Sequence, residues 1–360
     1  EYNQILLYTN DGGIKWNKSD IFSTAGGLNT DIAVSMGYID VFDNLYSAIS
    51  GKNGNLFISN DSGQSWYKLQ LKGVDTGTTD YKTINIVEDT NGSNTHRIFI
   101  SYTIGDSNTG TTGIYYFDCN LSTIFTPIDT SAYLTTDTTI EIKTYIKAYE
   151  STTTTDNYYI TSASSTDTRV YYAGINGAFS YDNTISYDSN PNPLKLGNIS
   201  HNNNIYAFDD THAIAVSTTG ISYTTDGLTW THKIFGTDLN EPTHLGLSTM
   251  VLNSVFIHSL SNAIAVGSQG EFIYSTDWQN GVWQMVPDVL LNSSGMRDRI
   301  RGSENNLKSI SMPDINTMII ADTITPFVSN VDFTLTQLGY SKIQYCFLPN
   351  LFNHTNNTVL

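Results

Sequence analysis

The chain has 360 residues and a formal net charge of −17, and only 14% of its residues are charged, against a typical ~25%. So acidic a chain lacks the basic stripe that sequence-independent binding to nucleic acid needs. Its 23 tyrosines and 15 phenylalanines exclude a disordered acidic segment, and its many Asn, Thr, Ser and Gly residues favour strands and turns over helices. No apolar run approaches the ~20 residues of a membrane span.

Four turns along the chain share one pattern of residue types. Each begins with Ser or Thr, continues with Asp and Gly, and ends with Trp, in the first two copies as S/T-x-D-x-G-x-x-W. The pattern residues are Thr9, Asp11, Gly13 and Trp16; Ser59, Asp61, Gly63 and Trp66; Thr224, Asp226, Gly227 and Trp230; and Ser275, Asp277, Gly281 and Trp283. The third copy is one residue shorter and the fourth one residue longer. Because every tryptophan except Trp278 closes such a turn, the pattern indicates an internal repeat.

The segments before these turns are strand-like and repeat as well. The segment 213–216 recurs as 263–266, and 54–59 matches 270–275. Weaker copies of the strand and turn occur at 113–118, 177–182 and 327–332. Seven such units average about 51 residues each, close to the ~40–50 residues of a four-stranded propeller blade.

Each interval between turns has room for four short strands. From Asp226 to Asp277 we predict strands at 229–235, 249–258, 262–267 and 270–275. The longest interval is rich in Thr, and we expect insertion loops at about 130–165.

The two ends of the chain complement each other. Residues 1–20 supply a third strand with its turn, whereas 340–360 supply a first and a second strand, beginning with 341–347. Together they make one closing blade, which hides the edges of the sheet. The sequence therefore predicts a single all-β domain over 1–360. It is a seven-bladed β-propeller of four-stranded antiparallel blades, with the ring closed by strands from both termini.

Elementary chemistry accounts for the residue types in the repeated turn. A short carboxylate accepts hydrogen bonds from backbone N–H groups of the turn, and glycine permits the positive φ that the reversal requires. The tryptophan begins the outer strand and can bury its indole against the neighbouring blade. We therefore interpret the pattern residues as structural. A metal role is the alternative, although one carboxylate per turn is too few for calcium.

The repeated turn resembles the Asp-box, or bacterial neuraminidase repeat (BNR), and the resemblance covers essentially the whole chain. The chain is also similar to the propellers of photosystem II assembly factors. There an A-V-G strand, a G-x-I-x-x-T strand and a D-G-G-x-T-W turn succeed each other, as 262–267, 270–275 and 277–283 do here. The resemblance implies a propeller fold and boxes that lie away from any catalytic centre.

Sialidases are the best-known enzymes with such boxes, and the resemblance to them implies three substrate-binding arginines, a Tyr–Glu pair and an F-R-I-P motif before the first box. The nearest motif here is His96-Arg97-Ile98-Phe99, which lacks the proline and follows the second box. This departure argues against sialidase activity.

No other pattern points to catalysis or to a cofactor. The candidate acids for glycoside hydrolysis show no spacing that singles out a pair; they are Glu88, Glu141, Glu150, Glu241 and Glu304. The histidines form no zinc motif, and no glycine-rich loop resembles a phosphate cradle. We therefore expect no enzyme activity, no metal and no cofactor. A disulfide between Cys119 and Cys346 stays open.

One basic cluster stands out in this acidic chain. Arg297, Arg299 and Arg301 would dock an acidic partner, or else they lie in a solvated loop with Asp298 and Glu304 as partners. The favoured function is a non-catalytic structural or interaction propeller at a surface, such as a virion, a phage appendage or an extracellular layer. It would bind protein partners in a larger assembly, or glycans, with no nucleic acid and no membrane insertion. A carbohydrate-active propeller (glycosidase or lectin) and a membrane-complex assembly factor are the alternatives.

Overall fold

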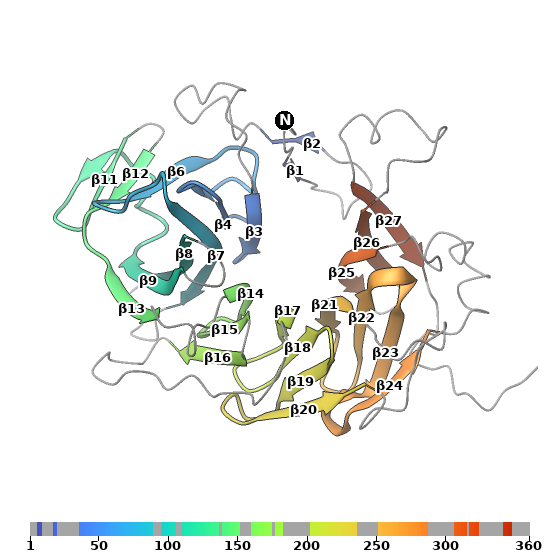
Figure 1. The fold of residues 1–360 in the computed structure, drawn as a ribbon. Coiled ribbons are helices and arrows are strands. Elements are labelled where there is room, and N and C mark those ends of the chain that lie inside the picture. The colour runs from blue at the N-terminus through green and yellow to red at the C-terminus, as the bar shows by residue number, and fades with distance from the viewer. Residues whose placement is uncertain are drawn as a thin grey trace, which may run out of the picture. The chain divides into compact units, whose positions relative to one another are not determined.

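A computed structural model describes residues 6–8, 17–19, 36–88, 95–105, 110–136, 139–151, 160–174, 177–182, 202–235, 251–286, 306–314, 317–323 and 341–347. These residues form strands and turns with two short 3-10 helices, and no α-helix occurs among them. The all-β class predicted from the sequence is confirmed. The chain divides into two compact units, residues 1–195 and 196–360. Each unit is a series of sheets that follow one another in chain order (Figure 1).

The first unit contains three successive sheets and a short strand pair. The pair consists of β1 (Leu7–Tyr8) and β2 (Asn17–Lys18). The first sheet has β3 (Met36–Val41), β4 (Ser47–Gly51), β5 (Leu56–Ser59) and β6 (Tyr67–Leu71). The second has β7 (Thr79–Glu88), β8 (His96–Ile104), β9 (Thr111–Cys119) and β13 (Ile146–Ser151). The third has β14 (Ile160–Ser165), β15 (Arg169–Gly174) and β16 (Gly177–Asp182).

The prediction of insertion loops at about 130–165 is wrong, because most of this segment is strand. Three strands extend the first sheet: β10 (Ile128–Asp129), β11 (Tyr133–Thr135) and β12 (Thr139–Ile142). Strand β12 pairs in parallel with β6, which lies far upstream in the sequence. The physical reason is the alternation of β12, whose Ile140 and Ile142 are buried in the core while its polar residues face outward.

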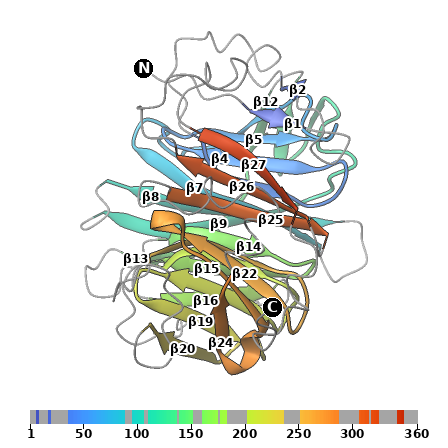
Figure 2. The same ribbon diagram turned by 90° about the vertical axis from the view of Figure 1, so that its right-hand side faces the viewer.

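The second unit also contains three sheets. The first has β17 (Asn202–Ala207), β18 (Ala213–Ser217), β19 (Gly220–Thr224) and β20 (Trp230–Ile234). The second has β21 (Leu252–Ile257), β22 (Ala263–Gly267), β23 (Phe272–Asp277) and β24 (Val282–Met285), with the 3-10 helices η1 (Ser268–Gly270) and η2 (Trp278–Asn280). The third has β25 (Asn306–Asp314), β26 (Thr317–Thr323) and β27 (Ser341–Phe347) (Figure 2). The strands predicted between Asp226 and Asp277 are thus confirmed, and the first two sheets of this unit are four-stranded and antiparallel, as predicted.

Strand β27 has a different partner from the one expected. The sequence analysis assigned residues 341–347 to a closing blade shared with the N-terminus, whereas β27 pairs with β26 along its whole length. The backbone of β26 offers β27 a continuous antiparallel edge, and local sequence patterns do not reveal which edge a strand will join. The expected neighbours at 358–360 lie outside the described residues.

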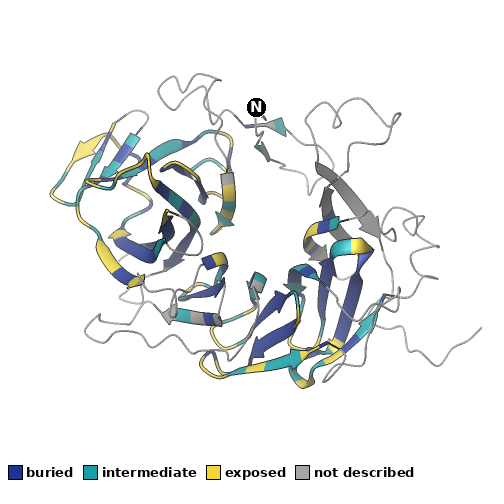
Figure 3. Ribbon diagram, viewed as in Figure 1, coloured by how far each residue is buried: buried dark blue, intermediate teal, exposed yellow. Residues whose placement is uncertain are grey.

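The middle strands of these sheets are buried on both faces. All residues of β4, β18, β19 and β22 are buried, as the dark ribbons of Figure 3 show. A strand covered on both faces reads as a near-continuous run of small and apolar residues, which explains the A-I-A-V segments of β18 and β22.

The first strands of successive sheets carry a repeated bulge and lie against one another. Within the first unit β3, β7 and β14 pack together, and within the second unit β17, β21 and β25 do so. Each first strand loses register by one residue near its start, at Met36/Tyr38, Tyr81/Thr83, Ile160/Ser162, Asn202/Asn204, Leu252/Ser254 and Leu307/Ser309. Bulges of this kind are built-in features that bend a strand.

In the second unit the bulged residue also forms the joint to the next sheet. Asn203 Nδ2 donates to Leu252 O at 2.6 Å, and Asn253 Nδ2 donates to Leu307 O at 2.8 Å. The two bonds link equivalent positions of consecutive sheets, so one sheet joins the next by the same contact each time.

Cys119 is a free, buried thiol on β9, and burial raises its pKa well above the ordinary range. The disulfide that the sequence left open is therefore not formed at Cys119. The thiol serves as a small apolar group of the core.

Candidate functional site

The box at 59–66 closes on itself through side-chain hydrogen bonds. Ser59 Oγ accepts the backbone N–H groups of Asp61 and Gly63 and donates to Asp61 Oδ1 at 2.8 Å. The Asp61 carboxylate in turn accepts the backbone N–H of Ser65 at 2.9 Å and its hydroxyl. Partial burial alone would raise the pKa of Asp61, but these bonds outweigh it and the pKa is lowered. Gly63 has φ +79°, the left-handed conformation that the sequence analysis expected there.

The box at 224–230 repeats this arrangement. Thr224 Oγ1 accepts the N–H of Gly227 at 2.9 Å, and Asp226 Oδ1 accepts the N–H groups of Thr229 at 2.6 Å and Leu228 at 2.8 Å. The hydrogen bond from the backbone N–H of Thr229 is the largest cause that lowers the pKa of Asp226, and the bond from Leu228 is the second. The pKa falls to about 2. The carboxylate is thus held by its own turn, as the structural interpretation requires.

The box at 275–283 departs from the other two. Ser275 Oγ accepts the N–H of Asp277 at 3.1 Å and donates to Val282 O. The carboxylate of Asp277 receives the side-chain amide of Asn280, at 2.9 and 3.0 Å, where the other boxes use backbone N–H groups. This longer copy contains the 3-10 helix η2, and Gly281 takes the left-handed conformation at its end.

The box tryptophans are buried to different degrees. Trp66 is 2% exposed, Trp283 lies in the core between the first two sheets of the second unit, and Trp230 is only partly buried. Trp278, which follows Asp277 directly, is fully buried in the same core and donates to Ser259 O. The first box, with Thr9, Asp11, Gly13 and Trp16, lies outside the described residues.

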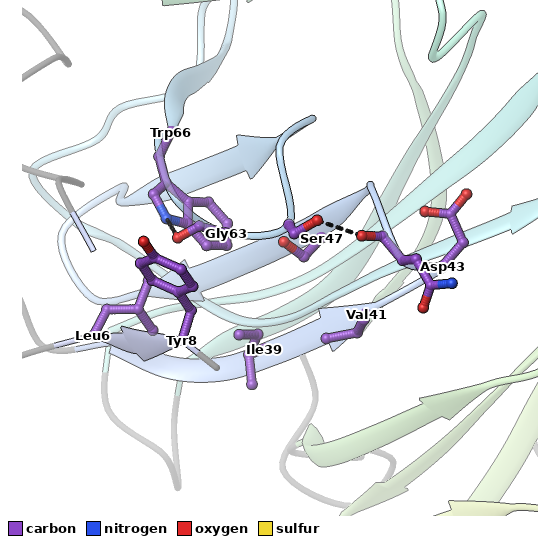
Figure 4. A pocket seen from close by; sticks show the side chains of 10 residues that line it. Leu6, Tyr8, Ile39, Val41, Asp43, Ser47, Gly63 and Trp66 are labelled. Carbon is purple, nitrogen blue, oxygen red and sulfur yellow. Dashed lines mark hydrogen bonds between the residues drawn. The ribbon is translucent and has the colours of Figure 1, made fainter. Parts of the chain in front are cut away.

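A pocket of about 270 Å³ lies beside the box at 59–66, within the first unit (Figure 4). Residues from four places line it: the start of the chain, strand β3 with its following turn, the first residue of β4, and the box itself. They are Leu6, Tyr8, Ile39, Val41, Asp43, Asn44, Ser47, Ser62, Gly63 and Trp66. The sequence analysis singled out only Gly63 and Trp66 of these, and assigned both to the scaffold.

The pocket combines an apolar wall with polar groups. Ile39 is 49% exposed and Val41 65% exposed, although both sit on a sheet strand. Ser47 is 5% exposed, and its hydroxyl has no hydrogen-bond partner among the described residues. A buried polar group without a partner is costly. The pocket therefore has exposed apolar surface, and a covered, unsatisfied hydroxyl lies in its wall.

Asp43 is the one charged residue in this lining. It caps the turn between β3 and β4, where its Oδ1 accepts the N–H groups of Leu45 at 2.7 Å and Tyr46 at 2.6 Å. The equivalent turn of the second unit holds Asp209, whose Oδ1 accepts the N–H groups of Thr211 and His212 in the same way. This D-x-x-aromatic turn is a second repeat, which sequence comparison of the two segments could have found.

A second polar cluster joins the three first strands of the first unit. Asp40 on β3 accepts the N–H of Ile86 on β7 at 2.9 Å and the hydroxyl of Ser165 on β14 at 3.1 Å. Asn85 Nδ2 donates to Tyr38 Oη at 3.0 Å, and Tyr38 Oη donates to Ala163 O at 2.6 Å. Desolvation raises the pKa of Asp40 to about 6, although the bonds from Ile86 and Ser165 oppose this rise.

Within the described residues, the side chains that sialidase chemistry would need are hydrogen-bonded to other side chains. Arg97 forms two hydrogen bonds to Asp118, at 2.7 and 2.9 Å, and lies over the ring of Tyr116. A Tyr–Glu pair exists, since Tyr102 Oη donates to Glu150 Oε2 at 2.8 Å. Burial raises the pKa of Tyr102 well above its ordinary value, which is the opposite of what a phenolate nucleophile needs.

The predicted basic cluster falls outside the part of the chain that the structure describes. Arg297, Arg299 and Arg301, and the weak copy at 327–332, lie outside the described residues. Within the described part of the chain, no group of three His, Cys, Asp or Glu side chains gathers as metal ligands do. In the same part, no helix has the length and apolarity to cross a membrane.

No family model matches this sequence, and no curated protein matches it. Among solved structures, the chain is similar to YCF48 bound to D1 peptide, at 10% identity over 88% of this chain and 93% of that one, with a TM-score of 0.41. YCF48 from Cyanidioschyzon merolae gives 10% identity, 88% and 96% coverage and a TM-score of 0.42. The WD40 β-propeller domain of Doa1 is 11% identical over 88% of this chain and 84% of that one, with a TM-score of 0.45. At TM-scores below 0.5 we draw no functional conclusion from these similarities.

Proposed function

We propose that residues 1–360 form a single seven-bladed β-propeller, with Asp-box hairpins at the outer strands and a ring closed by strands from both termini. The repeated joints between sheets support this proposal. Sheets that meet their neighbours through the same bulged first strand, and that bury both faces, generate a regular succession of sheets. Closing the succession into a ring removes the exposed faces and edges at its two ends.

The proposed function is non-catalytic interaction at a surface, such as a virion, a phage appendage or an extracellular layer. The observation that carries it is the set of exposed apolar side chains around the pocket: Ile39, Val41 and, in the adjoining turn, Leu45, which is 44% exposed. Exposed apolar residues that gather at one place mark protein interaction sites more often than isolated ones do. We infer that this face, defined by Ile39, Val41 and Leu45, binds a protein partner.

Small-angle scattering of the full-length protein tests the fold. A compact domain of this length has a radius of gyration of roughly 21 Å. A single ring should match that value and give one compact distance distribution. A clearly larger radius with a two-peaked distribution would show two separate lobes and contradict the propeller.

A matched pair of substitutions tests the function. Val41→Asp places a charge on the proposed face, whereas Leu228→Asp places one on a box residue that is 60% exposed in the second unit. Tagged full-length protein, cross-linked in its native source, should lose its partners with Val41→Asp and keep them with Leu228→Asp. Equal recovery by both variants would contradict the interaction face. Turnover of any fluorogenic glycoside would instead favour the carbohydrate-active alternative.

A further inference from the structure

The two D-x-x-aromatic turns differ in one respect that bears on the pocket. In the second unit the carboxylate of Asp209 also bonds the imidazole of His212, with Nδ1 at 2.9 Å from Oδ1 and 3.0 Å from Oδ2. In the first unit the aromatic position is Tyr46, and no hydrogen bond or ion pair to Asp43 Oδ2 is found within the described residues. The carboxylate of Asp43 therefore retains an oxygen that the same turn elsewhere uses internally.

Asp43 belongs to the lining of a pocket whose character changes from one end to the other. Figure 4 shows Leu6 and Tyr8 at one end, Asp43 at the other, and Ile39 and Val41 along β3 between them. Two residues along a strand span roughly 7 Å. This length suits the aliphatic stem of a lysine or arginine, which prefers apolar surface while its charged head seeks a carboxylate.

We propose that this pocket receives a lysine or arginine side chain of a protein partner, with its stem on Ile39 and Val41 and its cationic head on Asp43. This inference rests on the proposed function, because it names the partner chemistry of the same face. The net charge of −17 attracts a basic partner over a longer range.

A neutral sugar fits this pocket less well. A pyranose needs an open aromatic face, which only the half-buried Tyr8 could supply, because the indole of Trp66 is 2% exposed and its Nε1 already donates to Ser19 Oγ and Gly63 O. An anionic ligand is disfavoured because the described lining contains Asp43 and no basic residue. The cation is therefore the ligand that the lining favours.

Titration with two small probes tests the inference on the full-length protein. N-acetyl-arginine methylamide carries the cation, and N-acetyl-citrulline methylamide is its neutral counterpart of nearly the same shape. The indole N–H resonance of Trp66, assigned with Trp66→Phe, reports occupancy of the pocket. The arginine probe should shift this resonance and bind about tenfold more tightly than the citrulline probe, and raising the salt concentration should weaken the binding.

Two isosteric variants supply the control. Asp43→Asn keeps an acceptor for the turn and removes the charge, and Asp209→Asn makes the same change in the equivalent turn. The first should weaken arginine binding about tenfold, and the second should leave it within about twofold. Equal binding of both probes, equal effects of both variants, or a methyl glycoside that shifts Trp66 irrespective of Asp43 would overturn the inference. If the probes fail while Val41→Asp still loses its partners, the proposed function stands and only the basic side chain is refuted.

Discussion

The indole Nε1 of Trp66 donates to the hydroxyl of Ser19 at 2.8 Å, across 47 residues of sequence. Ser19 Oγ in turn donates to Gly63 O at 2.7 Å, inside the box. Through this one buried hydroxyl, the box at 59–66 holds the short pair β1–β2 against the first sheet. The box tryptophan is therefore both the end of a hairpin and the anchor of a neighbouring element.

Ser19→Ala removes this anchor. Loss of a buried hydroxyl that both accepts and donates should lower the free energy of unfolding by about 1–2 kcal/mol. Because β1 and β2 are only two residues long, amide exchange at Leu7 and Tyr8 should accelerate more than exchange in β4. Hydrogen exchange read by mass spectrometry measures both, with Ser122→Ala, in an exposed turn of the same unit, as the control. Unchanged exchange in β1 would refute the anchoring role.

The boxes should differ in what their aspartates contribute. Asp61→Ala removes an acceptor of backbone N–H groups and should lower the free energy of unfolding by about 1 kcal/mol. Asp277→Ala removes only the contact with the Asn280 amide and should change it by less than about 0.5 kcal/mol. Asp61→Asn retains an acceptor and should fall between these values. Urea unfolding measures the free energy of unfolding of the three variants. An equal decrease for Asp61→Ala and Asp277→Ala would contradict the expected difference.

Asp40 should make stability depend on pH. Its folded-state pKa of about 6 exceeds the ordinary 3.8, so the folded protein holds more protons than the unfolded chain between these values. The free energy of unfolding should therefore fall as the pH rises from 4 to 6, by on the order of 1–2 kcal/mol after allowance for partial exposure.

Asp40→Asn should flatten this part of the pH profile. Ser165→Ala removes a donor to the ionised carboxylate, so it should raise the pKa of Asp40 further. The free energy of unfolding should then fall more steeply as the pH rises. Urea midpoints at pH 4.5 and 7 for the three proteins supply the measurement. Identical pH profiles in all three would show that Asp40 titrates in its ordinary range.

The asparagine joint of the second unit should carry measurable stability. Asn253→Ala leaves the buried carbonyl of Leu307 without its donor and should cost about 1–3 kcal/mol. Amide exchange in β25 should rise at the same time. Asn280→Ala, which changes an exposed amide of the same unit, serves as the control. If β25 exchanges at the wild-type rate in Asn253→Ala, the two sheets are held together by other contacts.

Local sequence patterns were enough to predict the box hairpins. The order of Ser or Thr, Asp, Gly and Trp specifies a turn because its hydrogen bonds join residues two to four apart, as at Ser59, Asp61 and Ser65. Short apolar segments such as 263–267 specify buried strands because their composition leaves no polar face. For these reasons the all-β class and the strands next to the boxes were predictable.

Pairings between distant segments required the folded molecule. Strand β12 joins β6, and Asp40 meets Ile86 and Ser165, through contacts that no local pattern encodes. The pocket arises in the same way, from residues near the start of the chain and residues around the second box. Such arrangements depend on which surfaces can be buried together, and that burial is a property of the whole packed unit.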